Sequence, residues 1–291
     1  MQKVMITGAS GQLGLALYRL LQDNSAYELL RTSAFANEGS TIQALDIAEE
    51  HAVNEYIQAH KPDIILNCAA MTAVDLCETE QETAYRINAL GPKYLAAAAE
   101  QIGAKLVHVS TDYVYDGMGN EPYTEELTPN PLSVYGRTKL EGEVFVRENC
   151  EKYFILRTAW VYGEGKNFVK TMLRLAEQNN MIRVVADQYG TPTSALELAR
   201  VIIFLMNTES YGVYHATGEG SASWYEFAKT IFEETGKTVD LEPIPTSEYK
   251  VAAKRPMYSV LDNKALRERH GYVMMDWRLA FKEYVSELNA E

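Results

Sequence analysis

The sequence is poor in cysteine and in long apolar runs. Its 291 residues include only three cysteines, Cys68, Cys77 and Cys150, whose spacing fits neither a metal site nor a disulfide framework. We therefore expect three reduced thiols that pack. No apolar run approaches the roughly 20 residues of a membrane-spanning helix, and Met1 leads into a predicted strand without a basic leader. These absences predict a cytoplasmic protein that does not enter a membrane.

Positive charge is also scarce. Lysine and arginine together number 27 against 40 aspartates and glutamates, which gives a net charge of −13. Nucleic-acid binding needs a basic surface, so the balance argues against it. Any anionic substrate must instead be held by a local site rich in cations or N–H groups. Repeats and long linkers are missing, and 291 residues suffice for one large domain or for one domain with a smaller lobe.

The first half of the chain alternates short apolar runs with amphipathic patterns. The runs predict strands at 4–7, 27–32, 64–67, 106–110 and 153–157, and the patterns predict helices at 11–22, 49–60, 80–102 and 134–148. This alternation favours an α/β fold, a Rossmann-type doubly wound parallel sheet. In such a sheet ligands bind beyond the carboxyl ends of the strands.

The second half has a looser pattern. It predicts helices at 168–179, 195–206 and 224–235, strands at 183–185 and 214–216, and a loop-rich stretch at 243–256. We therefore predict a dinucleotide-binding domain formed by 1–157 with part of 186–210. The remaining segments, 158–185 and 211–291, are expected to form a smaller C-terminal substrate-binding lobe.

Three glycines follow the first predicted strand and open a leucine-rich helix. Gly8 permits a tight turn, Gly11 lets the backbone approach a pyrophosphate, and Gly14 allows close packing of helix on strand. The helix N-terminus then directs free N–H groups at the anion. An ordinary glycine turn is the alternative, but the strand-turn-helix context favours a dinucleotide.

A phenol and an ammonium lie four residues apart on a predicted helix. Tyr135 and Lys139 therefore share one helical face, and a nearby cation lowers the pKa of a tyrosine. Tyr135 is a candidate proton donor to a carbonyl under reduction. Thr111, at the end of a predicted strand, could donate to the same oxygen. The alternatives are a solvated helix face and a turn-forming threonine.

Several residues near other strand ends are candidates for the cofactor. Arg31 suits a 2′-phosphate, although a solvated arginine is an equal alternative. Asp46 and Ile47 could flank the adenine, and an N-cap role for Asp46 is as plausible. Ala69 and Ala70 are small enough for a cofactor to pass the backbone, or they pack a helix.

Together these motifs resemble the extended short-chain dehydrogenase/reductase family. The shared motifs are Gly8-x-x-Gly11-x-x-Gly14, Asn67-Cys-Ala-Ala70, Ser110-Thr111-Asp112 and Tyr135-x-x-x-Lys139. Further strings resemble the dTDP-4-dehydrorhamnose reductases within it: Thr72-Ala-Val-Asp75 with Glu78, the run from Ser110 to Gly117, Arg157-Thr-Ala-Trp-Val-Tyr-Gly163, Asp187-Gln-x-Gly-x-Pro-Thr193 and Arg255-Pro256. The resemblance covers nearly the whole chain.

The resemblance implies reduction of the 4-keto group of dTDP-4-dehydro-L-rhamnose to dTDP-L-rhamnose, a precursor of cell-surface polysaccharide, by NADPH, with NADH possible. It implies a catalytic triad of Thr111, Tyr135 and Lys139. The residues expected at the cofactor are Gly8, Gly11, Gln12, Leu13, Gly14, Arg31, Asp46, Ile47, Ala69, Ala70, Met71, Thr72, Tyr135 and Lys139. Those expected at the substrate are Thr72, Val74, Thr111, Asp112, Tyr113, Tyr135, Trp160, Asn167, Gln188 and Arg255.

Some members of this family carry a glutamate just after the third glycine and use magnesium at a dimer interface. This chain has Leu15-Ala16 there, so we expect no required metal and a monomer or weak homodimer. Two alternatives stay open: a reductase of another nucleotide-linked 4-keto sugar, and a non-catalytic NADP-binding regulatory subunit. The joint presence of Thr111, Tyr135 and Lys139 counts against the second.

Overall fold

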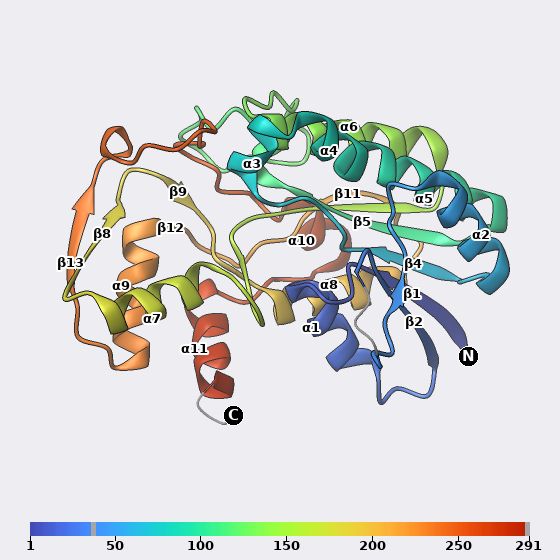
Figure 1. Ribbon diagram of the computed structural model, residues 1–291, viewed down its shortest axis with the longest axis horizontal. Coiled ribbons are helices and arrows are strands. Elements are labelled where there is room, and N and C mark those ends of the chain that lie inside the picture. The colour runs from blue at the N-terminus through green and yellow to red at the C-terminus, as the bar shows by residue number, and fades with distance from the viewer. Residues whose placement is uncertain (36–38, 289–291) are drawn as a thin grey trace.

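Seven parallel strands form the central sheet of the computed structural model, which describes residues 1–35 and 39–288 (Figure 1). Their order across the sheet is β11-β6-β5-β4-β1-β2-β3. The bounds are β1 Gln2–Thr7, β2 Tyr27–Ser33, β3 Gln43–Ala44, β4 Ile64–Asn67, β5 Lys105–Thr111, β6 Tyr153–Thr158 and β11 Gly212–His215. Strands β2 and β3 are added on one side of β1, and β4, β5 and β6 on the other, and this change in strand order creates the crevice in which doubly wound sheets bind ligands. The predicted fold class is confirmed.

Helices cover both faces of this sheet (Figure 1). One face packs against α1 (Gln12–Leu21) and α8 (Ala195–Met206), the other against α2 (Glu50–His60), α5 (Gly91–Ile102) and α6 (Val134–Asn149). Successive residues of a strand point to opposite faces, so Val4 and Ile6 join the first core while Met5 joins the second. This two-sided burial explains why the central strands read as continuous apolar runs.

The segment predicted as one helix over 80–102 is divided into several elements. It follows α3 (Val74–Thr79) and comprises α4 (Gln81–Tyr85), a π-helical turn (Arg86–Leu90) and α5. Pro92 accounts for the irregular turn, because proline has no N–H and its ring crowds the carbonyl four residues earlier, that of Asn88. The wide turn brings the Asn88 carbonyl against α6, where a Cβ on Gly142 would lie 2.3 Å from it.

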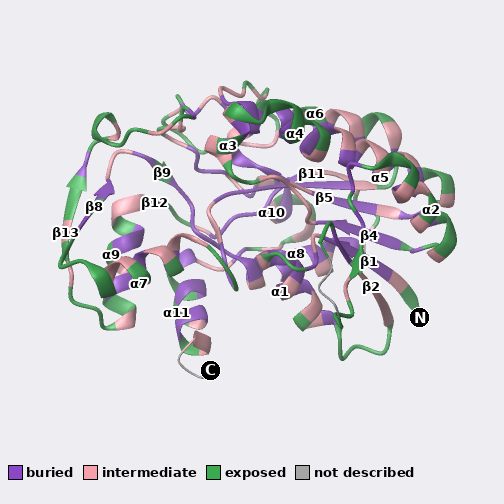
Figure 2. Ribbon diagram, viewed as in Figure 1, coloured by how far each residue is buried: buried purple, intermediate pink, exposed green. Residues whose placement is uncertain are grey.

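A smaller group of elements lies beside the carboxyl edge of the sheet. It contains α7 (Phe168–Gln178), β8 (Met181–Val185), α9 (Trp224–Thr235), β13 (Asp240–Ile244) and α11 (Trp277–Leu288), around a core of its own. The predicted helices at 168–179 and 224–235 are confirmed. The sequence did not predict β13, an exposed edge strand that contains Pro243 and pairs in parallel with β8 (Figure 2).

Shorter elements complete the fold. They are β7 (Val161–Tyr162), β9 (Tyr189–Gly190), β10 (Thr193–Ser194), β12 (Ala222–Ser223), α10 (Lys264–His270) and 3₁₀ turns at Asp112–Val114 and Thr246–Glu248. The predicted strand at 214–216 corresponds to β11, which pairs with β6 in the main sheet. The division into domains stays a prediction. All three cysteines are free, and within 1–35 and 39–288 no helix is both long and apolar enough to cross a membrane.

Candidate active site

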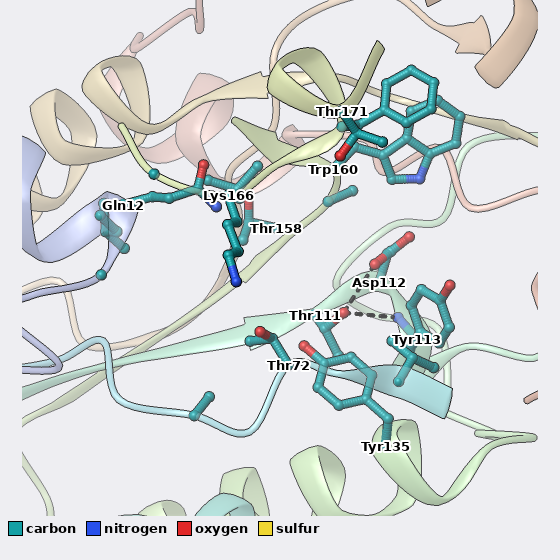
Figure 3. A pocket seen from close by; sticks show the side chains of 18 of the residues that line it. Gln12, Thr72, Thr111, Asp112, Tyr113, Tyr135, Thr158, Trp160, Lys166 and Thr171 are labelled. Carbon is teal, nitrogen blue, oxygen red and sulfur yellow. Dashed lines mark hydrogen bonds between the residues drawn. The ribbon is translucent and has the colours of Figure 1, made fainter. Parts of the chain in front are cut away.

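A cavity of about 870 Å³ lies between the carboxyl edge of the sheet and the smaller group of helices. It collects most of the residues predicted from the sequence. Those that line it are Gly8, Gly11, Gln12, Leu13, Gly14, Ala70, Thr72, Val74, Thr111, Asp112, Tyr113, Tyr135, Lys139, Trp160, Gln188 and Arg255. Figure 3 shows Thr72, Thr111 and Tyr135 gathered on one side and Trp160 on the other.

The glycine turn has the close approaches that a dinucleotide cradle requires. Gly8 has a φ of 61°, and a Cβ there would lie 2.8 Å from the backbone of Ala69. A Cβ on Gly14 would lie 2.5 Å from the Gly8 carbonyl. Gly11 is the N-cap of α1 and offers no side-chain cap, so the first N–H groups of the helix are available to an anion. The turn therefore fits a pyrophosphate.

Capping contacts fix the start of α6, which carries Tyr135. The Ser133 hydroxyl accepts a hydrogen bond from the Gly136 amide at 3.1 Å, and the Glu78 carboxylate accepts one from the Val134 amide at 2.8 Å. A Cβ on Gly136 would lie 2.1 Å from the Tyr113 carbonyl oxygen. Glycine at this position therefore lets the segment after β5 pack directly against the helix.

The Thr111 hydroxyl lies at the end of β5, close to the Tyr135 phenol. It donates to Asp112 Oδ1 at 2.9 Å and accepts from the Tyr113 amide at 3.3 Å (Figure 3). Burial raises the pKa of Asp112 to about 6, against opposing hydrogen bonds from Ser259 and Thr111. A carboxyl with this pKa changes its charge near neutral pH, directly beside the predicted catalytic hydroxyl.

Burial dominates the titration of Tyr135. It raises the pKa of the phenol above its ordinary value, while a hydrogen bond with Thr111 acts in the opposite direction. The prediction that Lys139 brings this pKa below its ordinary value is wrong, because the net shift is upward. Only 8% of Tyr135 is exposed, so the loss of solvation outweighs the hydrogen bond. The phenol is accordingly protonated at neutral pH.

Lys139 is buried deeper than Tyr135. Its ammonium donates to the Val109 carbonyl at 2.6 Å. Burial lowers the pKa of Lys139 to about 8, and the charge of Glu143 acts to raise it. Lys139 is therefore mostly charged at pH 7, and its charge is sensitive to nearby groups.

Aromatic side chains form the opposite wall of the cavity. Trp160 adopts a φ of 46°, which is rare for a bulky residue, and its ring stacks on Trp224 with centroids 3.5 Å apart and an interplanar angle of 9°. A Cβ on Gly190 would lie 2.5 Å from Trp160 Cε2, so this glycine also holds the ring. Phe168 packs against Trp224 with centroids 4.6 Å apart. The ring of Trp160 is thus held between Trp224 of α9 and Gly190 of β9.

Two of the predicted substrate residues are held by their own contacts. Arg255 forms an ion pair with Asp75, and its Nη1 donates to the Tyr113 hydroxyl at 3.3 Å. Gln188 donates to Thr246 Oγ1 at 3.0 Å.

In the part of the chain that the structure describes, no group of three His, Cys, Asp or Glu side chains could hold a metal ion.

Other predicted residues lie outside the lining of the cavity. The Arg31 guanidinium stacks 3.7 Å from the ring centre of Tyr18 and donates to Thr41. Asp46 Oδ1 accepts from the Ala48 amide, and Ile47 is buried. Their proposed contacts with the cofactor stay predictions.

Ala69, Met71 and Asn167 support the lining instead of joining it. The backbone of Ala69 packs on Gly8, and both backbone polar groups of Met71 are bonded to the Asn88 amide, at 2.9 and 3.0 Å. Asn167 caps α7 and donates to Gln12 Oε1 at 3.1 Å. The roles proposed for them at the ligands stay predictions.

Sequence reasoning missed several residues at the sheet edge and much of the wall that faces it. The cavity is also lined by Ser10, Cys68, Ser110, Thr158, Glu164, Lys166, Phe168, Thr171, Arg183, Trp224 and Tyr249, among others. The Lys166 ammonium points into the cavity (Figure 3). Its place in the glycine-flanked run Gly163-Glu-Gly-Lys166 was the one local signal that could have identified it.

Comparison with known proteins gives matches over the whole chain. The family model described as "RmlD substrate binding domain" matches residues 1–290. The spore coat polysaccharide biosynthesis protein SpsK of Bacillus subtilis is 42% identical over 288 residues, 99% of this chain and 98% of that protein.

Two solved structures are similar to this chain over nearly its full length. A dTDP-4-dehydrorhamnose reductase from Clostridium acetobutylicum has a TM-score of 0.94 and 47% identity, covering 99% of each chain. The Bacillus anthracis dTDP-4-dehydrorhamnose reductase, solved in complex with NADP, has a TM-score of 0.92 and 42% identity, covering 98% of this chain and 99% of that one. The chain therefore belongs to the RmlD substrate binding domain family, the family of the dTDP-4-dehydrorhamnose reductases.

Proposed function

We propose that the chain reduces the 4-keto group of dTDP-4-dehydro-L-rhamnose to dTDP-L-rhamnose, with NADPH as the reductant. The observation that carries this proposal is the convergence of Thr111, Tyr135 and Lys139 on one cavity that also contains the glycine turn. The two similar reductase structures, one of them with NADP, support the same reaction and cofactor.

Tyr135 is the proton donor in this proposal. Its raised pKa keeps the phenol protonated at neutral pH, so it has a proton to give to the carbonyl oxygen. NADPH, when bound on the glycine turn, would supply the hydride that the carbonyl carbon accepts. A phenol held beside the carbonyl stabilises the negative charge that develops on the oxygen and then neutralises it.

Thr111 is the second donor to that oxygen. A hydroxyl has one proton, and the Thr111 proton is directed at Asp112 Oδ1. Donation to a substrate therefore requires the hydroxyl to rotate away from Asp112. Because the pKa of Asp112 is raised to about 6, the strength of this competing bond depends on pH near neutrality.

Cations that line the cavity are the proposed binding groups for the diphosphate. Lys166, Arg183 and Arg255 line the cavity in a chain whose net charge is −13. Arg183 is paired with glutamates and Arg255 with Asp75, whereas Lys166 has no ion pair among the described residues. Lys166 is therefore the cation most accessible to a phosphate.

The test is turnover of freshly generated dTDP-4-keto sugar, followed by loss of nicotinamide absorbance with NADPH and, separately, NADH. Tyr135→Phe should lower kcat by at least about 10²-fold, the lower end for loss of a general acid, and leave the affinity for NADPH unchanged. Tyr56→Phe is the matched control, because its hydroxyl bonds Gln43 at the exposed surface. Wild-type kcat in the Tyr135 variant would refute the assignment.

The same assay separates the alternatives. Faster turnover of a UDP-linked keto sugar than of the dTDP-linked one would indicate another nucleotide-sugar reductase. Binding of a partner protein without oxidation of NADPH would indicate a regulatory subunit.

Light scattering of the purified chain tests the expected monomer or weak homodimer, and cell fractionation tests the expected cytoplasmic location.

A further inference from the structure

A buried ion pair lies directly behind the proposed reaction centre. The Glu143 carboxylate is fully buried and accepts hydrogen bonds from Arg157 Nε at 2.9 Å and Nη2 at 2.6 Å. It also accepts one from the Ser110 hydroxyl at 2.6 Å. Arg157 in turn donates to the Tyr115 hydroxyl at 2.7 Å. A buried ion pair is weak evidence for stability, since its replacement by apolar side chains is often neutral or stabilising. The position of this pair behind the reaction centre is therefore more informative than its contribution to stability.

Glu143 continues the face of α6 that carries Tyr135 and Lys139. The three residues are spaced by four, so they lie one above another on the helix, and all three are buried. Each of the last two contacts the end of β5. Lys139 donates to the Val109 carbonyl, and Glu143 accepts from Ser110, the residue just before Thr111. The helix thus holds two successive residues of the strand that ends in the catalytic hydroxyl.

We propose that Glu143 is a positioning residue of the reaction centre. It holds the Thr111 end of β5 opposite Tyr135 through Ser110, and its charge keeps Lys139 protonated while Arg157 balances that charge on the far side. The inference rests on the proposed function, whereas the contacts of Glu143 and the charge of Lys139 can be measured without turnover.

The other titratable groups around Lys139 are neutral, so Glu143 is the neighbour whose charge acts on its pKa. Cys68, from the segment after β4, has its thiol pKa raised to about 12 and is neutral. His108, on β5, has its pKa lowered by burial and by Lys139, so it is neutral too. Tyr135 stays protonated. Glu143 on α6, paired with Arg157 on β6, is the charged neighbour.

The sign of the effect follows from these neighbours. Lys139 loses its proton as the pH rises through its pKa of about 8. Removing the Glu143 charge removes a stabilisation of the ammonium, so the pKa of Lys139 falls. A neighbouring opposite charge shifts a pKa by about 1 to 3 units, and Arg157 keeps its charge in Glu143→Gln. We therefore expect this substitution to lower the Lys139 midpoint by at least about 1 unit.

The experiment is a pH titration of the full chain with ¹³C-labelled lysine, followed by NMR, with Lys139→Met to assign the signal. Glu143→Gln should lower the Lys139 midpoint and shift the alkaline limb of kcat/KM to lower pH by the same amount. Ser110→Ala, which removes a contact but no charge, should lower kcat several-fold and leave the midpoint unchanged.

A second variant covers a failure of Glu143→Gln to fold. The double variant Glu143→Gln with Arg157→Met removes both buried charges together, and it should also show a lowered Lys139 midpoint. A midpoint equal to that of the wild type in a folded variant of Glu143 would overturn the proposal, as would wild-type kcat in Ser110→Ala. A wild-type chain that titrates as expected but does not reduce the keto sugar would refute the proposed function alone.

Discussion

Gly136 offers a sharp test of how packing sets the position of the proton donor. It lies between Tyr135 and Arg137 in the first turn of α6, and an added Cβ would lie 2.1 Å from the Tyr113 carbonyl oxygen. Ordinary contact begins at 3.4 Å, so the helix and the segment after β5 would have to separate by about 1.3 Å, the difference between the two distances. The oxygen belongs to backbone and offers no flexible side chain that could move away.

This separation should affect catalysis more than stability. Overpacking costs about 1–3 kcal/mol, and replacing a helical glycine by alanine returns about 1 kcal/mol of helix propensity. We therefore expect Gly136→Ala to lower the free energy of unfolding by about 1 kcal/mol, the net of these two values. A displacement of about 1 Å of a catalytic group costs roughly 10²-fold in rate, and kcat should fall by that factor.

The measurement combines urea unfolding with steady-state kinetics on the dTDP-linked keto sugar. Arg137→Ala is the control, because it changes the adjacent, exposed position of the same helix turn. It should keep kcat close to the wild-type value. The reasoning is refuted if Gly136→Ala retains full kcat, or if its kcat falls only in proportion to a large loss of folded protein.

Three further substitutions test other parts of the site. Arg31→Ala should raise KM for NADPH by about 10-fold or more and leave KM for NADH unchanged, since a hydrogen bond to a charged group contributes about 1.5–3 kcal/mol; equal effects on both cofactors would exclude a 2′-phosphate contact. Trp224→Ala should raise KM for the nucleotide sugar up to about 10-fold, because an aromatic pair contributes about 0.5–1.5 kcal/mol, and should change the near-UV circular dichroism from its stack with Trp160. Asp112→Asn should abolish a pH dependence of stability. The folded pKa of Asp112 is raised from 3.8 to about 6, so the wild type loses about 3 kcal/mol relative to the variant as the pH rises from about 4 to above 6, and identical pH profiles in urea unfolding would contradict this.

The strands and the cofactor turn were predictable because their signals are local. The strands β1, β4, β5 and β6 appear as apolar runs since they are buried on both faces, and the glycine turn is specified by three residues within seven positions. The carboxyl ends of parallel strands share one edge. Thr111 ends such a strand and Tyr135 lies at the start of a helix at the same edge, so the rule places both at one cavity although they are separated by 24 positions.

The cavity wall formed by the smaller group of elements was not predictable, because no local signal marks it. Trp224, Phe168 and Arg183 belong to elements whose local pattern is that of ordinary helices and strands. Their place at the cavity depends on how the smaller group of elements packs against the sheet edge. No spacing within the sequence encodes that packing, so only the structure identifies these side chains.

Tyr135 and Lys139 show most clearly what the spacing of residues in a sequence cannot predict. The interval of four predicted a shared face, and the structure has it. The interval also suggested that the Lys139 ammonium sets the pKa of the Tyr135 phenol. That would require their interaction to shift each pKa by more than burial does. Burial instead raises the pKa of Tyr135 and lowers that of Lys139. Burial therefore decides the direction of both pKa shifts, and Glu143, the third buried position on the same face, acts on Lys139 through its charge.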